Sequence, residues 1–199
     1  MSRKINKVIL LLTLSDIFTW GPYTIIAALA GLYLANKLGE NVIQYIGIGT
    51  SIYFITRAAV QIPLGTLTDK IKKDKDEISF LLIGVILMGL TFALYPLISK
   101  PYHYFFLQFL FGFGASLNVT NWRKLFALNI EKGKEGFNYA FYETSISIAT
   151  TLLSVLVGYV ASLGEIYFDT VMYLSGAVMT LAGLWVALIY TIEKRKSRK

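Results

Sequence analysis

The chain has 199 residues, of which 55% are hydrophobic and 16% are charged, and its mean hydropathy is +0.59. Soluble domains carry charge on about a quarter of their residues, so this composition excludes an ordinary soluble fold. The absence of cysteine excludes disulfides and thiol-ligated metal sites, and the net charge of +7 sits in short blocks between long apolar runs. This pattern predicts an integral membrane protein.

Six apolar segments follow one another along the chain, each long enough for a bilayer-crossing helix, which needs about 20 residues. The connections are too short for a soluble domain, so residues 1–199 are predicted to form a single all-α, six-helix transmembrane domain. The predicted spans are Val8–Ala35, Asn41–Thr66, Ile78–Ser99, Tyr102–Trp122, Phe137–Ser162 and Tyr167–Ile192.

Basic residues concentrate on one set of connections. Residues 1–7, 69–77, 123–136 and 193–199 hold 16 of the 19 Lys and Arg, whereas the alternate loops hold only Lys37 and Lys100. Short cytoplasmic loops carry such an excess, so we expect both termini on the cytoplasmic side of an inner or plasma membrane. The basic blocks flank spans instead of forming one face, which indicates anionic headgroups of the lipid bilayer and excludes nucleic acid as the partner.

Three charged residues lie in the cores of the predicted spans, away from the span ends: Asp16, Arg57 and Glu143. At a rise of about 1.5 Å per residue, all three fall at similar depths in the cytoplasmic half. A charge at such depth is costly unless it is paired or hydrated. Two interpretations stay open: Asp16 and Arg57 form a static bridge that orients two helices, or Asp16 or Glu143 changes protonation during transport.

Each of these charges heads a polar stripe with helical spacing, such as Asp16, Trp20 and Tyr23 in the first span. The fourth span carries Asn118 and Asn121. Because polar groups that face lipid are costly, spans one, two, four and five are predicted to line a polar interior. Spans three and six have no charged residue in their cores and are predicted to form an apolar outer pair.

Residues 65–73, GTLTDKIKK, resemble the loop between the second and third helices of the major facilitator superfamily, which reads G-x-L-x-D-R/K-x-G-R/K. Lys72 replaces the second glycine. Residues 108–115, QFLFGFGA, are similar to the family stretch R-x-x-x-G-x-G-A, with Gln108 in place of the arginine. The resemblance implies alternating access around a central cavity, a 3+3 inverted repeat, and a gating charge network formed by Arg57, Gly65, Asp69, Lys70 and Lys73.

The family has two six-helix halves, and this chain supplies one. The leading hypothesis is therefore a half-size secondary transporter that works as a homodimer on a small solute, with the cavity at the two-fold interface; proton coupling is an open part of it. The predicted coupling residues are Asp16 and Glu143, and the predicted solute contacts are Asp16, Trp20, Tyr23, Asn118 and Trp122.

Two alternatives remain: half of a split transporter whose other half is a separate chain, or a non-transporting membrane scaffold or regulator. No nucleophile–base, metal-ligand or phosphate-loop constellation occurs in the sequence. An enzyme, a cofactor and a metal site are therefore not predicted.

Overall fold

The computed structural model describes residues 5–70 and 74–196, and every regular element in these ranges is helical. Two short 3-10 turns, η1 (Tyr95–Leu97) and η2 (Glu165–Tyr167), precede the fourth and sixth long helices. The prediction of an all-α chain is confirmed. The long helices are α1 (Lys7–Leu38), α2 (Val42–Lys70), α3 (Asp74–Ala93), α4 (Pro101–Asn129), α5 (Glu135–Ser162) and α6 (Phe168–Lys196).

Local signals explain where several helices begin and end. The side chain of Asn6 accepts a hydrogen bond from the backbone N–H of Val8 and caps the first turn of α1. At the other end Gly39 adopts a positive φ of 77° and its N–H bonds to the carbonyl of Ala35, a conformation that glycine enters without steric cost. Pro101 occupies the first turn of α4, where its missing N–H costs nothing.

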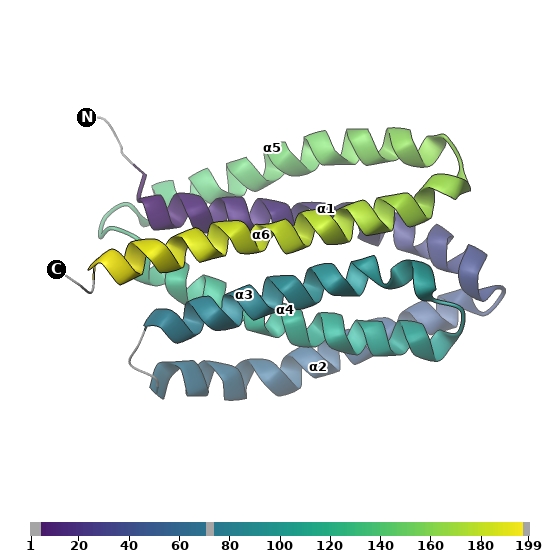
Figure 1. Ribbon diagram of the computed structural model, residues 1–199, viewed down its shortest axis with the longest axis horizontal. Coiled ribbons are helices and arrows are strands. Elements are labelled where there is room, and N and C mark those ends of the chain that lie inside the picture. Colours follow the sequence, from purple (N-terminus) through teal and green to yellow (C-terminus); the bar gives the residue numbers. More distant parts are fainter. Residues whose placement is uncertain (1–4, 71–73, 197–199) are drawn as a thin grey trace.

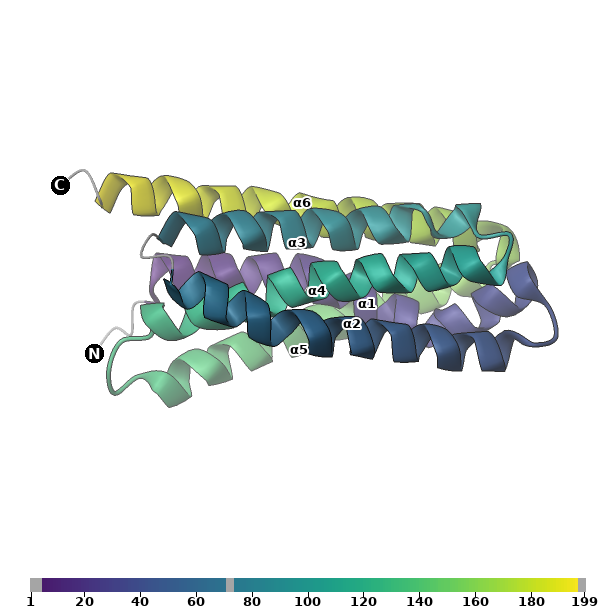
Figure 2. The same cartoon turned by 90° about the horizontal axis from the view of Figure 1, so that it is seen from below.

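All six helices run along the long axis of one bundle (Figure 1). The first turn of α1 and the last turn of α6 lie at the same end, here called the terminal end, together with the ends of α2 and α4. Figure 2 shows α3 and α6 on one side, α1 and α4 in the middle, and α2 and α5 on the opposite side. Both ends of the described chain therefore lie at one end of the bundle, as the charge pattern requires.

Glycines bring α3 into close contact with both of its neighbours. A Cβ placed on Gly84 would come within 2.7 Å of the backbone N of Asn118 in α4. One placed on Gly89 would come within 2.7 Å of the carbonyl O of Gly176 in α6. Small residues allow such backbone approach between helices in a membrane. This packing joins α3, α4 and α6 into a tight unit.

The prediction that α3 and α6 form an apolar outer pair is correct for their position but not for their exposure. They do lie away from the side that α2 and α5 form (Figure 2). However, half of the apolar stretch of α3 and 44% of that of α6 are buried, whereas none of that of α5 is. The most exposed apolar helix is therefore α5, because glycine-mediated contacts of α3 and α6, which polarity does not reveal, bury them against each other.

Four of the long helices are apolar enough, by length and composition, to cross a membrane: α1, α3 over Asp76–Ala93, α5, and α6 over Phe168–Ile192. The other two, α2 and α4, are as long as α5. They carry more polar side chains, among them Arg57 and Asn118. A six-span arrangement, the cytoplasmic location of both termini and an internal 3+3 repeat stay predictions.

We expect Gly89→Ala to destabilise the bundle by about 1–3 kcal/mol, the usual cost of overpacking, because its Cβ would lie 2.3 Å from Oγ1 of Thr180. The matched control is Gly31→Ala, whose Cβ would meet nothing within 4 Å and which should be neutral or stabilising, since alanine is the better helix former. Thermal unfolding in detergent micelles measures both. Equal midpoints for the two variants would contradict the close α3–α6 packing.

Candidate functional site

A polar cavity of about 260 Å³ lies between α1, α2, α4 and α5, in the half of the bundle nearer the terminal end. These are the four helices whose polarity predicts a shared interior. The cavity is lined by Asp16, Trp20, Arg57, Asn118, Val119, Trp122, Arg123 and Tyr142.

Four of the five predicted solute contacts, together with Arg57, meet in this cavity. The fifth, Tyr23, lines a second cavity instead. Glu143 is exposed on α5 and is not part of the lining, although it directly follows Tyr142, which bonds to Asp16. Sequence spacing alone therefore assembles most of this lining, but not the residue that α5 contributes to it, Tyr142.

Asp16 is the one carboxylate among the described residues that line the cavity. Its side chain is buried, with 3% of the residue exposed. The hydroxyl of Tyr142 donates a hydrogen bond of 2.6 Å to Oδ2 of Asp16, while Oδ1 has no partner. A neutral hydroxyl from α5 thus bonds to one oxygen of the carboxylate, and the other oxygen has no hydrogen-bond partner.

Arg57 is held by its own helix. Its Nη1 donates to the hydroxyl of Tyr53, one turn earlier in α2, at 2.9 Å, and its guanidinium lies 5.3 Å from the centre of that ring. Its Nε is buried without a partner. No ion pair joins Arg57 to Asp16, two residues that the structure describes in full. The static-bridge interpretation is wrong, because a tyrosine holds each charge separately.

Two tryptophans form fixed walls of the cavity. The indole N–H of Trp20 donates to Oδ1 of Asn118 at 3.2 Å, and the amide nitrogen of Asn118 is buried without a partner. The indole N–H of Trp122 donates to the carbonyl of Leu12 at 3.0 Å, and its ring stacks on Phe126 at 4.6 Å. Buried tryptophans usually find such partners, and here the bonds orient both rings.

A second cavity of about 160 Å³ lies farther from the terminal end and is lined mostly by aromatic and apolar side chains. Phe111 contacts three rings there, with centroids 5.2 Å from Tyr23, 5.6 Å from Tyr53 and 5.1 Å from Phe92. We call these four residues the aromatic layer. Trp20 contacts Tyr23 edge-on at 5.2 Å, so the aromatic layer lies next to the polar cavity on its far side.

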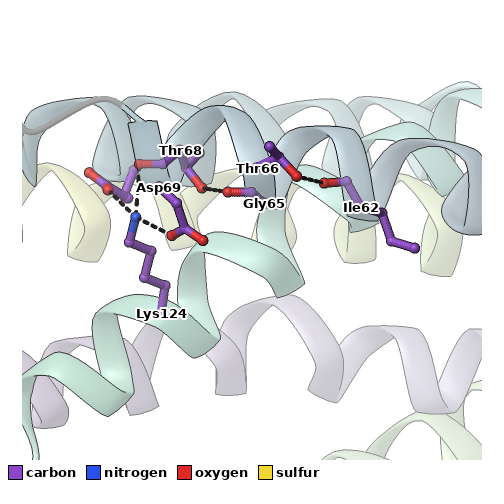
Figure 3. A network of polar contacts seen from close by, with 7 residues as sticks. Ile62, Gly65, Thr66, Thr68, Asp69 and Lys124 are labelled. Carbon is purple, nitrogen blue, oxygen red and sulfur yellow. Dashed lines mark hydrogen bonds and ion pairs between the residues drawn. The ribbon is translucent and has the colours of Figure 1, made fainter.

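The residues predicted to form one gating network do not all lie together in the structure. Asp69 forms an ion pair of 2.9 Å with Lys124 of α4 (Figure 3). A Cβ placed on Gly65 would lie 3.8 Å from Cγ2 of Thr120 in the same helix. Lys70 is exposed, and the structure pairs it with no carboxylate in the part of the chain that it describes. Lys73 lies outside the described residues. Arg57 belongs to the polar cavity and not to this group.

Lys124 is the centre of the network at the end of α2. Its Nζ also lies 2.9 Å from Oε1 of Glu77 and donates to the carbonyl of Thr68 at 2.8 Å. Burial disfavours its charge, but the hydrogen bonds to Asp69 and Glu77 outweigh burial and raise the pKa of Lys124. Neither Lys124 nor Glu77 is predicted from the sequence, since both read as members of charged loop blocks.

A family model described as Major Facilitator Superfamily matches residues 10–199, nearly the whole chain. No curated protein and no solved structure matches it.

Replacing Lys124 by Met removes the cation beside Glu77, whose side chain is only 4% exposed. Because a buried charge is left without its partner, we expect a loss of about 3–5 kcal/mol in the free energy of unfolding. The matched control is Lys70→Met, which removes an exposed lysine of the same connection and should change stability little. Denaturant unfolding in micelles compares the two, and a larger loss for Lys70→Met would contradict the network.

Proposed function

The chain belongs to the major facilitator superfamily, whose members are transporters, and on that premise we propose that it is a half-size secondary transporter. Two copies enclose one central space and move a small solute by alternating access. The observation that carries this proposal is a cavity lined by charges and flanked by two helices, α2 and α5, whose outer faces are apolar and uncovered.

The uncovered faces are extensive. On α2, Ile55 and Ile62 are 68% and 77% exposed, and on α5, Val155 and Tyr159 are 70% and 65% exposed. Within the chain α2 packs mainly on α4, and α5 mainly on α1. The two helices therefore border the cavity from either side without covering their own outer surfaces.

Lipid alone could cover apolar side chains but not the cavity between them. Arg57 is half-buried and Arg123 is exposed, so the charged lining reaches the surface of the single chain. A charge facing the middle of the bilayer costs about 2.5–3.5 kcal/mol on insertion scales. A second copy related by a two-fold axis covers both faces and encloses the charges, and this favours a homodimer.

The aromatic layer supports alternating access. It lies between the polar cavity and the far end of the bundle, and the rings of Tyr23, Tyr53 and Phe92 all contact Phe111. Passage of a solute to the far end requires these rings to separate. The polar cavity, in contrast, lies nearer the terminal end, and this placement supports a transport cycle in which the rings close the far side.

Proton coupling is carried by Asp16 in this proposal. Its carboxylate lines the cavity, is bonded to the neutral Tyr142 instead of an arginine, and has one oxygen free to take a proton. Glu143 is the second candidate, because it is exposed on α5 and directly follows Tyr142, the hydrogen-bond donor to Asp16.

The homodimer predicts that α2 of one copy cross-links to α5 of the other in native membranes. Because the two-fold axis passes through the central space, a cysteine on α2 is tested against a cysteine on α5 of the partner copy: Ile55→Cys and Val155→Cys chains are co-expressed and treated with a bifunctional thiol reagent. Both residues are exposed, and the chain has no other cysteine. The matched control co-expresses Ile55→Cys with Leu184→Cys, 61% exposed on α6, and should stay monomeric because α6 lies on the opposite side. Exclusive monomers for the Ile55→Cys and Val155→Cys pair would contradict the dimer, and co-purification of a different six-helix chain would favour a split transporter.

The coupling role predicts that Asp16→Asn abolishes solute-dependent proton flux in reconstituted vesicles that contain a pH-sensitive dye. Asparagine keeps the size and the hydrogen bond from Tyr142 but cannot exchange a proton. Glu143→Gln, measured in parallel, tells which carboxylate carries the proton. Unchanged proton flux with Asp16→Asn would remove Asp16 from the coupling step, and the same result with both variants would exclude coupling through either.

A further inference from the structure

We propose that the solute of the polar cavity is amphoteric: a small molecule with an anionic group, such as a carboxylate, that binds Arg57, and a cationic group, such as an ammonium, that binds Asp16. This inference rests on the proposed function, because it names the substrate class of the same cavity. It is carried by the way in which the lining presents its charges and its unpartnered atoms.

Asp16 shares the cavity with two cations, Arg57 and Arg123, and no ion pair joins it to either of them among the described residues. Tyr142 of α5 occupies one oxygen of Asp16, and Tyr53 of α2 occupies one nitrogen of Arg57. Oppositely charged groups that share a site of low polarity attract each other strongly, so keeping them apart requires specific contacts. The two tyrosines supply those contacts, and the cavity that both charges line has a volume of about 260 Å³.

The buried atoms without a hydrogen-bond partner indicate which chemical groups a bound solute must carry. Oδ1 of Asp16 is an acceptor, and Nε of Arg57 and the amide nitrogen of Asn118 are donors, and all three atoms are buried without a partner. Buried polar atoms are almost always hydrogen-bonded in folded proteins. A ligand that satisfies all three must donate from a cationic group at one end and accept at an anionic group at the other.

Solutes of a single charge type fit this lining less well. An anion without a cationic group leaves Asp16 unpaired, and a cation without an anionic group leaves Arg57 and Asn118 unpaired. A neutral solute pairs neither charge, and buried polar groups that a ligand leaves unpaired discriminate strongly against it. The tryptophan walls add an apolar surface, and the indole face also favours an ammonium group.

The cavity also limits the size of the solute. Its volume of about 260 Å³ lies below the range of about 300–1,000 Å³ typical of pockets for drug-sized ligands. Because Asp16 and Arg57 come from the same chain, a homodimer would present this pair of charges twice. We therefore expect two equivalent solute sites per dimer, each of them for a molecule the size of a short amino acid.

The three tryptophans of the chain make a direct binding test possible. Trp20 and Trp122 line the cavity, whereas Trp185 packs on Phe18 with ring centroids 5.7 Å apart and is not part of the lining. In the full-length Trp185→Phe variant, reconstituted in lipid nanodiscs, the fluorescence therefore reports the cavity alone. The probes are straight-chain ω-amino acids from glycine to 6-aminohexanoate, with carboxylates and alkylammonium ions of matching length.

We expect saturable fluorescence changes for one or more ω-amino acids, with an affinity at least about tenfold above that of either matched single-charge probe. Asp16→Asn should reduce the affinity for the amino acid toward that of the carboxylate, and Arg57→Gln toward that of the ammonium ion. The probe series on Trp185→Phe alone needs neither cavity variant, so it remains decisive if one of them fails to fold. Equal affinity for a single-charge probe, or no binding anywhere in the series, would overturn the inference.

Solute exchange in proteoliposomes separates this inference from the proposed function. Exchange of radiolabelled glucose, a neutral probe, without amino-acid binding would retain a transporter and overturn the amphoteric solute. Tight binding of an ω-amino acid without its exchange across the vesicle membrane would retain the site and count against transport.

Discussion

The structure depends on how an apolar bundle holds two opposite charges apart. Asp16 and Arg57 line one cavity, yet each is bonded to a tyrosine instead of to the other. Burying a charge is costly unless hydrogen bonds and partners compensate for it. Because hydrogen bonds from tyrosines stabilise the two charges and no ion pair joins them, the cavity stays polar and accessible. The four surrounding helices shield this cavity from lipid.

The two sides of the bundle differ in how closely their helices pack. On one side α3 packs on α4 and α6 through backbone contacts at Gly84, Gly89 and Gly176, which leaves no space for a side chain. On the other, α2 and α5 expose apolar faces on either side of the cavity. Lys124 joins the ends of α2 and α3 to α4 through Asp69 and Glu77. One side is thus a rigid support, and the other is a surface that a second copy can cover.

Much of this arrangement is predictable from the sequence, because burying charge and polarity in lipid leaves few alternatives. Helical spacing and depth bring Asp16, Trp20 and Arg57 to one cavity, and the signature-like loop places Asp69 correctly at the end of α2. The partners of these charges are not predictable. Nothing in the pattern singles out Tyr142 among 13 tyrosines, and Lys124 reads as one more basic residue of a charged block between two predicted spans. Such contacts depend on helix rotation and crossing, which hydropathy and spacing do not determine.

The central claim is that each chain supplies one charged cavity and that a second copy covers it, so that the two cavities open into one central space. A structure of the full chain in lipid nanodiscs tests this most directly. The account predicts two copies related by a two-fold axis along the membrane normal, with α2 and α5 of each copy facing the other and the charges of Asp16 and Arg57 directed into a shared cavity. A single chain with α2 and α5 in contact with lipid would contradict it.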